Sequence, residues 1–256
     1  MDFSQLHAFQ WGLLLFTAFI QGMSKGGIPG LAVMAIPIVA MVVPGKASTG
    51  LVLPMLIVGD LFALAYWRRS VSICDLLRAM PWAVLGVVAG WWLLGRINDA
   101  QMKPLVGATV LFILAMNLWR KRAAQKKTVD PTARPVGLLR QHVFPAFMGS
   151  LGGVTTMLAN AAGPVISAYL LSLKLTKETF LGTSAWFFFI INWVKVPFMI
   201  QQQMITPGSL RVNLMLVPAL VLGVVVGVLV AKRINQRVFE VLVTTLAPIA
   251  TLRLFF

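Results

Sequence analysis

The sequence has little of what metal centres and redox sites need. Its 256 residues include only seven acidic residues, two histidines and one cysteine. Cys74, being alone, excludes a disulfide within the chain and a cysteine-based metal cluster. His7 and His142 only flank apolar segments, so a haem or metal site inside a membrane would have no histidine ligand. We therefore expect no metal and no cofactor.

The signatures of energy use and catalysis are missing as well. The chain has no phosphate-binding G-x-x-x-x-G-K-[ST] pattern, so we do not expect it to hydrolyse ATP. No Ser/His/Asp set and no paired carboxylates occur inside its apolar stretches. These absences predict that the protein is not an enzyme and has no catalytic residues.

The sequence is rich in long apolar segments. Hydrophobic residues make up 59% and charged residues only 11%, whereas soluble domains carry roughly 25% charged residues. Several apolar runs are long enough to cross about 30 Å of hydrocarbon. The net charge of +15 lies mostly at segment ends and in short loops. We interpret it as a topology signal and as contacts to an anionic lipid bilayer, with no nucleic acid partner.

The apolar pattern predicts an all-α polytopic membrane protein with about five segments in each half. A first membrane repeat would span residues 1–118 and a second residues 143–256, joined by a basic cytoplasmic linker at 119–142. The predicted segments are 8–24, 31–44, 47–67, 79–95, 100–118, 143–159, 163–173, 179–200, 212–231 and 236–254.

An internal repeat supports this division. The stretches Pro81–Val106 and Pro218–Val243 align without a gap, with nearly half of their positions identical. Because each half has an odd number of segments, the halves should be inverted repeats, related by a two-fold axis in the membrane plane. We expect the first two segments of each half to be short and broken or re-entrant. The basic linker places the N-terminus outside, in a multi-pass cell inner membrane protein.

Two glycine-rich breaks, Gly22–Gly30 and Asn160–Pro164, separate the short segments of each half. A shift of 135 residues aligns Lys25 with Asn160. Non-helical backbone at membrane depth is tolerated only where protein buries it or where it lines a cavity. The two breaks therefore predict a midplane binding site between the repeats.

The residues of these breaks favour an anion as ligand. Lys25 supplies an ammonium group, and Gly26 and Gly27 would leave backbone N–H groups exposed near the start of the next helix. Asn160 can donate through its amide, and Gly163 permits close backbone approach. The alternative interpretation of Lys25 is a side chain that reaches back to the interface.

Asp60 and Lys195 are the charged residues inside long apolar segments, and the same 135-residue shift aligns them. We expect a mutual ion pair or a substrate contact, because an unpaired charge there is costly. Lys195 is a candidate second anion contact and Asp60 a candidate carrier of a coupling proton. The alternative is a static pair that fixes helix packing. Asn192, one turn before Lys195, and Thr183 are further candidates for lining the site.

The spacing G-x-x-x-G occurs at Gly86/Gly90 and again at Gly223/Gly227. Such small residues let membrane helices approach closely. The sequence leaves open whether they join the two repeats or form a homodimer face.

Four motifs resemble the TauE/SafE family of sulfite exporter-like permeases: Ser24–Gly27, Ala161–Pro164, Gly182–Thr183 and Asn192–Pro197. The resemblance covers nearly the whole chain. Many members have a glycine triplet in the first break, where this chain has Lys25. The resemblance implies transport of small sulfur-containing anions, such as sulfite and sulfonates, across the cytoplasmic membrane.

Together these features predict a secondary transporter whose partner is a small anionic substrate, with proton coupling through Asp60 as a further hypothesis. Two alternatives stay open. One is an anion channel with Lys25 and Lys195 as its selectivity feature. The other is a carrier of a non-sulfur organic anion such as a carboxylate, because the site distinguishes charge better than it distinguishes sulfur.

Overall fold

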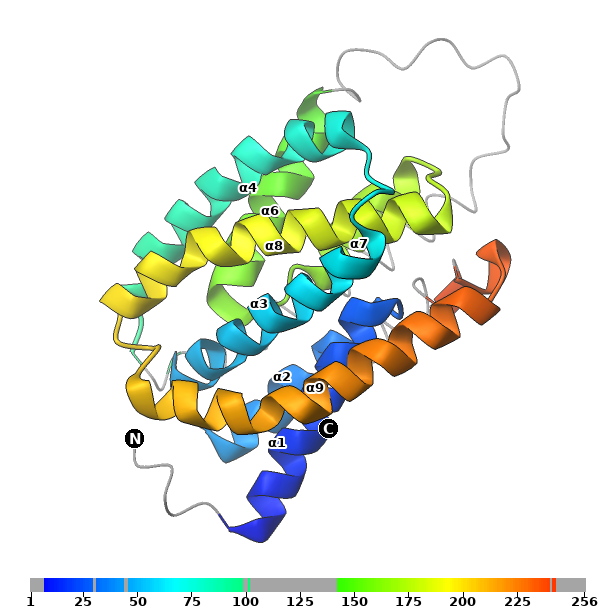
Figure 1. The fold of residues 1–256 in the computed structure, drawn as a ribbon. Helices are drawn as coiled ribbons and strands as arrows, with labels where there is room; N and C mark the ends of the chain where they lie inside the picture. Colours follow the sequence, from blue (N-terminus) through cyan, green and yellow to red (C-terminus); the bar gives the residue numbers. More distant parts are fainter. Residues whose placement is uncertain are drawn as a thin grey trace, which may run out of the picture.

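The computed structural model describes residues 7–29, 31–43, 46–98, 101, 142–239 and 241–242. All regular structure in these ranges is helical, which confirms the predicted all-α class. Figure 1 shows the helices packed against one another as a bundle. In chain order they are α1 (Ala8–Gly26), α2 (Ala32–Val42), α3 (Lys46–Trp67), α4 (Ile73–Leu94), α6 (Phe144–Ala159), α7 (Gly163–Ser172), α8 (Lys177–Gln201) and α9 (Pro207–Arg233).

These eight helices coincide with eight of the ten predicted segments, and most ends shift by only a few residues. The helix α4 begins at Ile73, six residues before the predicted start at 79. The helix α9 begins at Pro207, earlier than the apolar pattern predicts. There the Thr206 hydroxyl accepts a hydrogen bond from the Ser209 amide, and Pro207 occupies the first turn. Both features favour a helix start in sequence that is not yet apolar.

Part of the predicted organisation falls outside the described residues. This applies to nearly all of the segment 100–118 and the linker 119–142, and to most of the segment 236–254. The full number of crossings and the division at the linker therefore stay predictions.

Four helices, α3, α4, α8 and α9, are long and apolar enough to cross a membrane. By contrast, α2 and α7 have only 11 and 10 residues. At 1.5 Å per residue they reach about 16 Å, roughly half the hydrocarbon thickness. Each packs against the helix before it. We call α1 with α2 the first hairpin and α6 with α7 the second hairpin. The expectation that the first two segments of each half are short is met by α2 and α7. The helix α6 has 16 residues, but α1 has 19 and at about 28 Å is nearly as long as the hydrocarbon is thick.

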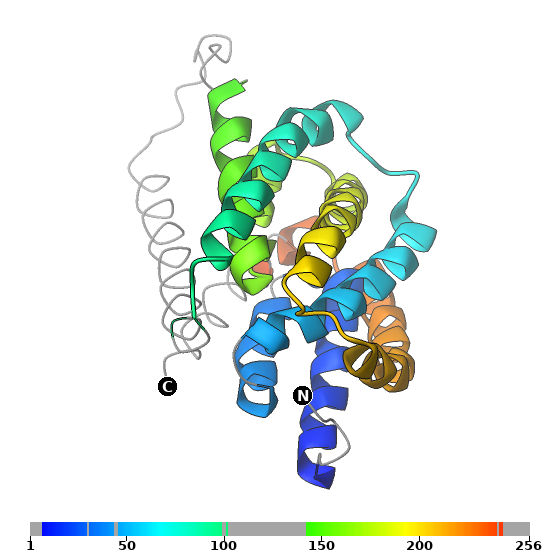
Figure 2. The ribbon, with the colours of Figure 1, turned by 90° about the vertical axis from the view of Figure 1, so that its left-hand side faces the viewer.

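The two halves of the chain interlock through glycine-lined contacts. The helix α1 packs along α9 and α4 packs along α6, as Figures 1 and 2 both show. Gly22 and Gly26 of α1 face Gly223 and Gly227 of α9, so closely that a Cβ atom on any of them would overlap opposing backbone. This close approach is the role that small residues have in membrane helix pairs.

The second seam repeats the arrangement. A Cβ atom on Gly86 of α4 would overlap the Ser150 carbonyl of α6, and one on Gly153 would overlap the Ala83 carbonyl. Both G-x-x-x-G pairs thus lie in contacts between the two halves of one chain. In the described residues these glycines therefore serve contacts within the chain.

These seams also correct the predicted extent of the breaks. Gly22 and Gly26 lie inside α1, and α6 runs unbroken to Ala159. The close fit of their glycines against a neighbouring helix is the reason that these stretches stay helical. The first break therefore begins only at Gly27.

Basic side chains gather at one end of the bundle, which we call the basic end. Arg68–Arg69 follow α3, and Lys232 in the last turn of α9 lies with its ammonium 4.6 Å from the centre of the Tyr66 ring. Lys177, at the start of α8, donates a hydrogen bond of 2.9 Å to the Ile234 carbonyl. The ends of α3 and α9 and the start of α8 thus share one face.

Candidate functional site

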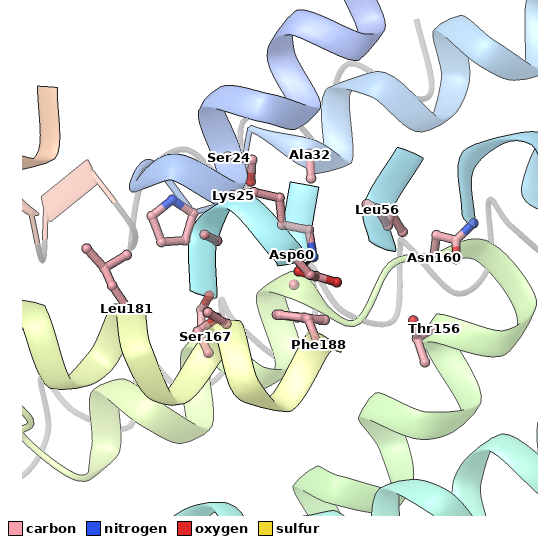
Figure 3. A pocket seen from close by; sticks show the side chains of 15 residues that line it. Ser24, Lys25, Ala32, Leu56, Asp60, Thr156, Asn160, Ser167, Leu181 and Phe188 are labelled. Atoms are coloured by element: carbon pink, nitrogen blue, oxygen red, sulfur yellow. Dashed lines mark ion pairs between the residues drawn. The ribbon is translucent and has the colours of Figure 1, made fainter. Parts of the chain in front are cut away.

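The tips of the two hairpins meet at one cavity (Figure 3). In the first hairpin α1 ends at Gly26, and Gly27 caps it with φ 156° while its amide donates to the Met23 carbonyl. In the second, α6 ends at Ala159 and Asn160 adopts the left-handed conformation with φ 51°. Both predicted breaks therefore border the same space, as the sequence led us to expect.

The cavity has a volume of about 50 Å³, room for roughly three to five water molecules and hence for a small anion. Polar groups and apolar side chains share its wall. The polar and glycine residues are Ser24, Lys25, Asp60, Thr156, Asn160, Gly163, Ser167 and Ser184, and the apolar ones are Pro29, Ala32, Leu56, Ala63, Leu181, Ala185 and Phe188.

Lys25 and Asp60 form an ion pair at this cavity. The Lys25 Nζ atom lies 2.6 Å from Asp60 Oδ1, and it also sits 4.4 Å from the centre of the Phe188 ring. Asp60 is fully buried, whereas 11% of the Lys25 side chain is exposed. The lysine is therefore the member of the pair that a solute in the cavity can reach. In the last turn of α1 its side chain turns to Asp60 inside the bundle.

Lys195 on α8 is fully buried and surrounded by neutral oxygens. Its ammonium donates to Asn160 Oδ1 at 2.6 Å, to Thr156 Oγ1 at 3.1 Å and to Asn192 Oδ1 at 3.2 Å. All three donor positions of a lysine are thus used, yet none of these partners carries a charge. Thr156 and Asn160 also line the cavity. Their side chains therefore lie between the cavity and the Lys195 ammonium group.

Asn192 links the two charged groups. Its side-chain amide donates to Asp60 Oδ2 at 2.7 Å, while its carbonyl oxygen accepts from Lys195. The direct Asp60–Lys195 ion pair considered from the sequence is replaced by this bridge, and Asp60 pairs with Lys25 instead. The reason is proximity, because each hairpin tip lies against the long helix of its own half. We call Lys25, Asp60, Asn192, Lys195 and Asn160 the buried polar chain. Its formal charge is +1.

Three residues predicted for the site lie elsewhere. Gly26 packs against the α9 backbone, and Gly27 faces Ala231 with its amide already used in the cap. The exposed N–H groups expected there are therefore absent. Thr183 accepts a hydrogen bond of 2.9 Å from the Ser72 amide, and so ties α8 to the loop before α4.

The sequence analysis also missed wall residues, above all Thr156, Ser167 and Phe188. One signal pointed to Thr156: it precedes Asn160 by four residues and therefore shares its helix face. Ser167 and Phe188 carry no such signal, because only the packing of α7 and α8 turns them to the cavity. Among the described residues no group of three His, Cys, Asp or Glu side chains comes together as a metal site would need.

A helical membrane bundle with a buried charged site between two short hairpins defines the class of polytopic membrane transporters. The comparison with known families agrees with this class. The family model described as sulfite exporter TauE/SafE matches residues 14–254. The chain belongs to this family, whose members are membrane transporters and not enzymes. No curated protein matches the sequence.

Proposed function

We propose that this protein is a secondary transporter of small organosulfur or sulfur oxyanions, such as sulfite and sulfonates, and that it holds the anion where the two hairpin tips meet. The observation that carries the proposal is the buried polar chain beside the cavity. It holds two lysines but one carboxylate, which pairs with Lys25 while Lys195 has only neutral partners, and an excess charge inside a membrane protein is costly unless a partner balances it. A single monovalent anion in the cavity supplies that balance.

Each wall group has a distinct part in this proposal. Lys25 supplies the ionic contact, because its side chain is the exposed one of the two lysines. Thr156 and Asn160 bring the anion within reach of the Lys195 charge. Gly163 starts α7, and a Cβ atom there would meet nothing within 4 Å, so an oxyanion can approach the positive end of that helix.

We further infer that the halves are inverted repeats, with residues 1–118 as one and 143–256 as the other. The contacts support this relation. If α1 corresponds to α6 and α4 to α9, then exchanging the halves converts the α1–α9 contact into the α4–α6 contact and leaves α3–α8 in place. The basic end then faces the cytoplasm and the N-terminus lies outside the inner membrane, because basic residues are retained inside.

A carrier fits the described conformation better than a channel. The cavity ends at Asn160, beyond which the next space, lined by Ile36, Ser48 and Thr49, has a volume of only about 10 Å³. That is room for about one water molecule. A carboxylate cargo remains the second candidate, because the same charges would bind it.

Proton coupling through Asp60 is a further part of this proposal, and the Lys25–Asp60 contact supports it. An anion that takes the place of Asp60 at Lys25 leaves that buried carboxylate without its ion-pair partner, and a proton would neutralise the carboxylate itself. Asp60→Asn should then uncouple anion flux from an imposed pH gradient. Flux that still responds to the gradient would leave Asp60 as a structural partner only.

The deciding experiment measures anion flux in proteoliposomes, with sulfite, short alkanesulfonates and carboxylates in parallel. We expect saturable flux, and thermal stabilisation of the purified protein by whichever anion is carried. Lys25→Met should reduce flux by about tenfold to a hundredfold, the equivalent of one charge-assisted contact of about 1.5–3 kcal/mol. The matched control is Lys174→Met in the α7–α8 loop, which should transport normally. Equal flux in both variants would contradict the proposed site.

A further inference from the structure

The side chain of Asn160 stands between two cavities. One is the main cavity described above, and the other is the smaller space of about 10 Å³ lined by Ile36, Ser48, Thr49, Val52 and Ala159. Asn160 contributes to the wall of both. Figure 3 shows it with Thr156 at the far end of the main cavity from Leu181 and Ser167. A solute moving from one cavity to the other must therefore pass this side chain.

Asn160 is held there from three sides. Its amide N–H donates to the Thr156 carbonyl at 3.0 Å and its side-chain amide donates to the Thr49 carbonyl at 2.9 Å. Its side-chain oxygen accepts the 2.6 Å hydrogen bond from Lys195. The backbone is left-handed, with φ 51°, a conformation that asparagine tolerates better than most residues. The side chain thus ties the tip of the second hairpin to the start of α3 and to α8.

The two cavities follow one another along α3. Asp60 and Ala63 of the main cavity belong to its second half, whereas Ser48 and Thr49 belong to its first turn. The eleven residues from Thr49 to Asp60 correspond to about 16 Å of helix. Since α3 finishes at the basic end, the main cavity lies toward that end and the small cavity toward the opposite end.

We propose that the two cavities are successive stations of one anion path and that Asn160 is the gate between them, latched by Lys195. This inference rests on the proposed function. The latch is the hydrogen bond from the Lys195 ammonium to the Asn160 side-chain oxygen. An anion that reaches Lys195 takes over that hydrogen bond with a stronger one in which both partners are charged, and releases Asn160 from α8. In this proposal the main cavity connects to the basic end, and the path is shut at Asn160.

Cysteine accessibility tests the gate without any transported solute. In a Cys74→Ser background, Ser24→Cys places a thiol in the main cavity and Ser48→Cys places one in the small cavity. A charged, membrane-impermeant thiol reagent is then added from the basic-end side of oriented vesicles. We expect rapid labelling of Ser24→Cys and at least tenfold slower labelling of Ser48→Cys.

Removing the gate should abolish that difference. Asn160→Gly keeps the left-handed backbone at no steric cost and deletes the side chain, so labelling of Ser48→Cys from the basic-end side should rise about tenfold. Asn160→Asp should keep it protected, because the carboxylate strengthens the bond to Lys195. Gln203→Gly, at another left-handed position (φ 54°) in the α8–α9 loop, is the matched control and should change nothing.

The outcomes separate the gate from the anion site. Unchanged protection of Ser48→Cys in Asn160→Gly, with Ser24→Cys still labelled, would overturn the gate. Rapid labelling of Ser48→Cys with Asn160 intact would overturn it as well. If the gate variants behave as expected but Lys25→Met transports normally, the path stands and the proposed anion contact fails.

Discussion

The two hairpin tips share a geometry but differ in charge. In the first half a cationic tip, Lys25, binds an anionic residue of the long helix, Asp60, at 2.6 Å. In the second half a neutral tip, Asn160, binds a cationic residue, Lys195, also at 2.6 Å. These are the pairs that the 135-residue shift aligns. The comparison shows the same contact between tip and long helix in both halves with different charges, which leaves one positive charge without a carboxylate.

The largest effect should come from breaking the Lys25–Asp60 ion pair at the tip of the first hairpin. Asp60→Leu leaves Lys25 without its carboxylate partner, and removing one partner of a buried ion pair costs about 3–5 kcal/mol. We expect a matching loss of thermal stability, measured by unfolding of the purified protein in detergent. The double variant Lys25→Met/Asp60→Leu should recover much of that loss, because no uncompensated charge remains at the tip.

The neutral tip provides the control for this prediction. Lys195→Met removes a cation whose partners are uncharged oxygens, so it should cost less than Asp60→Leu, about 1–3 kcal/mol for the hydrogen-bonding groups left unpaired. Equal losses in Asp60→Leu and Lys195→Met would mean that the two tips do not differ in the way described.

An intermediate effect is expected at the glycine seams, where the halves can also be compared. At Gly227 a new Cβ atom would overlap the Met23 backbone carbonyl, whereas at Gly90 its nearest neighbours are side-chain atoms of Met157. Overpacking typically costs about 1–3 kcal/mol, and the Met23 carbonyl approaches Gly227 more closely than the Met157 Cβ atom approaches Gly90, at 2.8 Å. Gly227→Ala should therefore lower thermal stability more than Gly90→Ala does. The reverse order would show that the α4–α6 seam is the more rigid one.

The smallest effect should come from Thr183, the residue that sequence and structure place differently. Thr183→Val removes one hydrogen bond acceptor for the Ser72 amide, at a cost of about 1 kcal/mol. Anion affinity, measured as thermal stabilisation by the carried anion, should not change. A clear loss of anion affinity in Thr183→Val would show that Thr183 contributes to the binding site.

Much of the fold could be predicted from the sequence because lipid imposes simple rules. Apolar length and the clustering of charges between segments were enough to locate α1 to α4 and α6 to α9 within a few residues. The breaks at Gly27 and Asn160 were also visible, because glycine, proline and asparagine interrupt helices for local reasons. The expected extent of the first break was too long, since glycine in a membrane helix can serve packing as well as breaking.

The composition of the site was predictable only in part. Lys25, Asp60, Asn160, Asn192 and Lys195 stood out because polar side chains inside apolar segments are costly and seldom accidental. Their pairing was not predictable. The sequence aligned Asp60 with Lys195 and suggested that they meet, whereas the structure joins each to a hairpin tip and places Asn192 between them.

The sequence by itself determined that this chain is a helical membrane protein, that the stretch Pro81–Val106 recurs as Pro218–Val243, and that five costly polar residues mark its interior. The tertiary structure decided which of those residues touch, because hydrogen bonds depend on the rotation and depth of packed helices. A shift of one helical turn, about 5.4 Å, is invisible in an apolar pattern but separates a 2.6 Å contact from none.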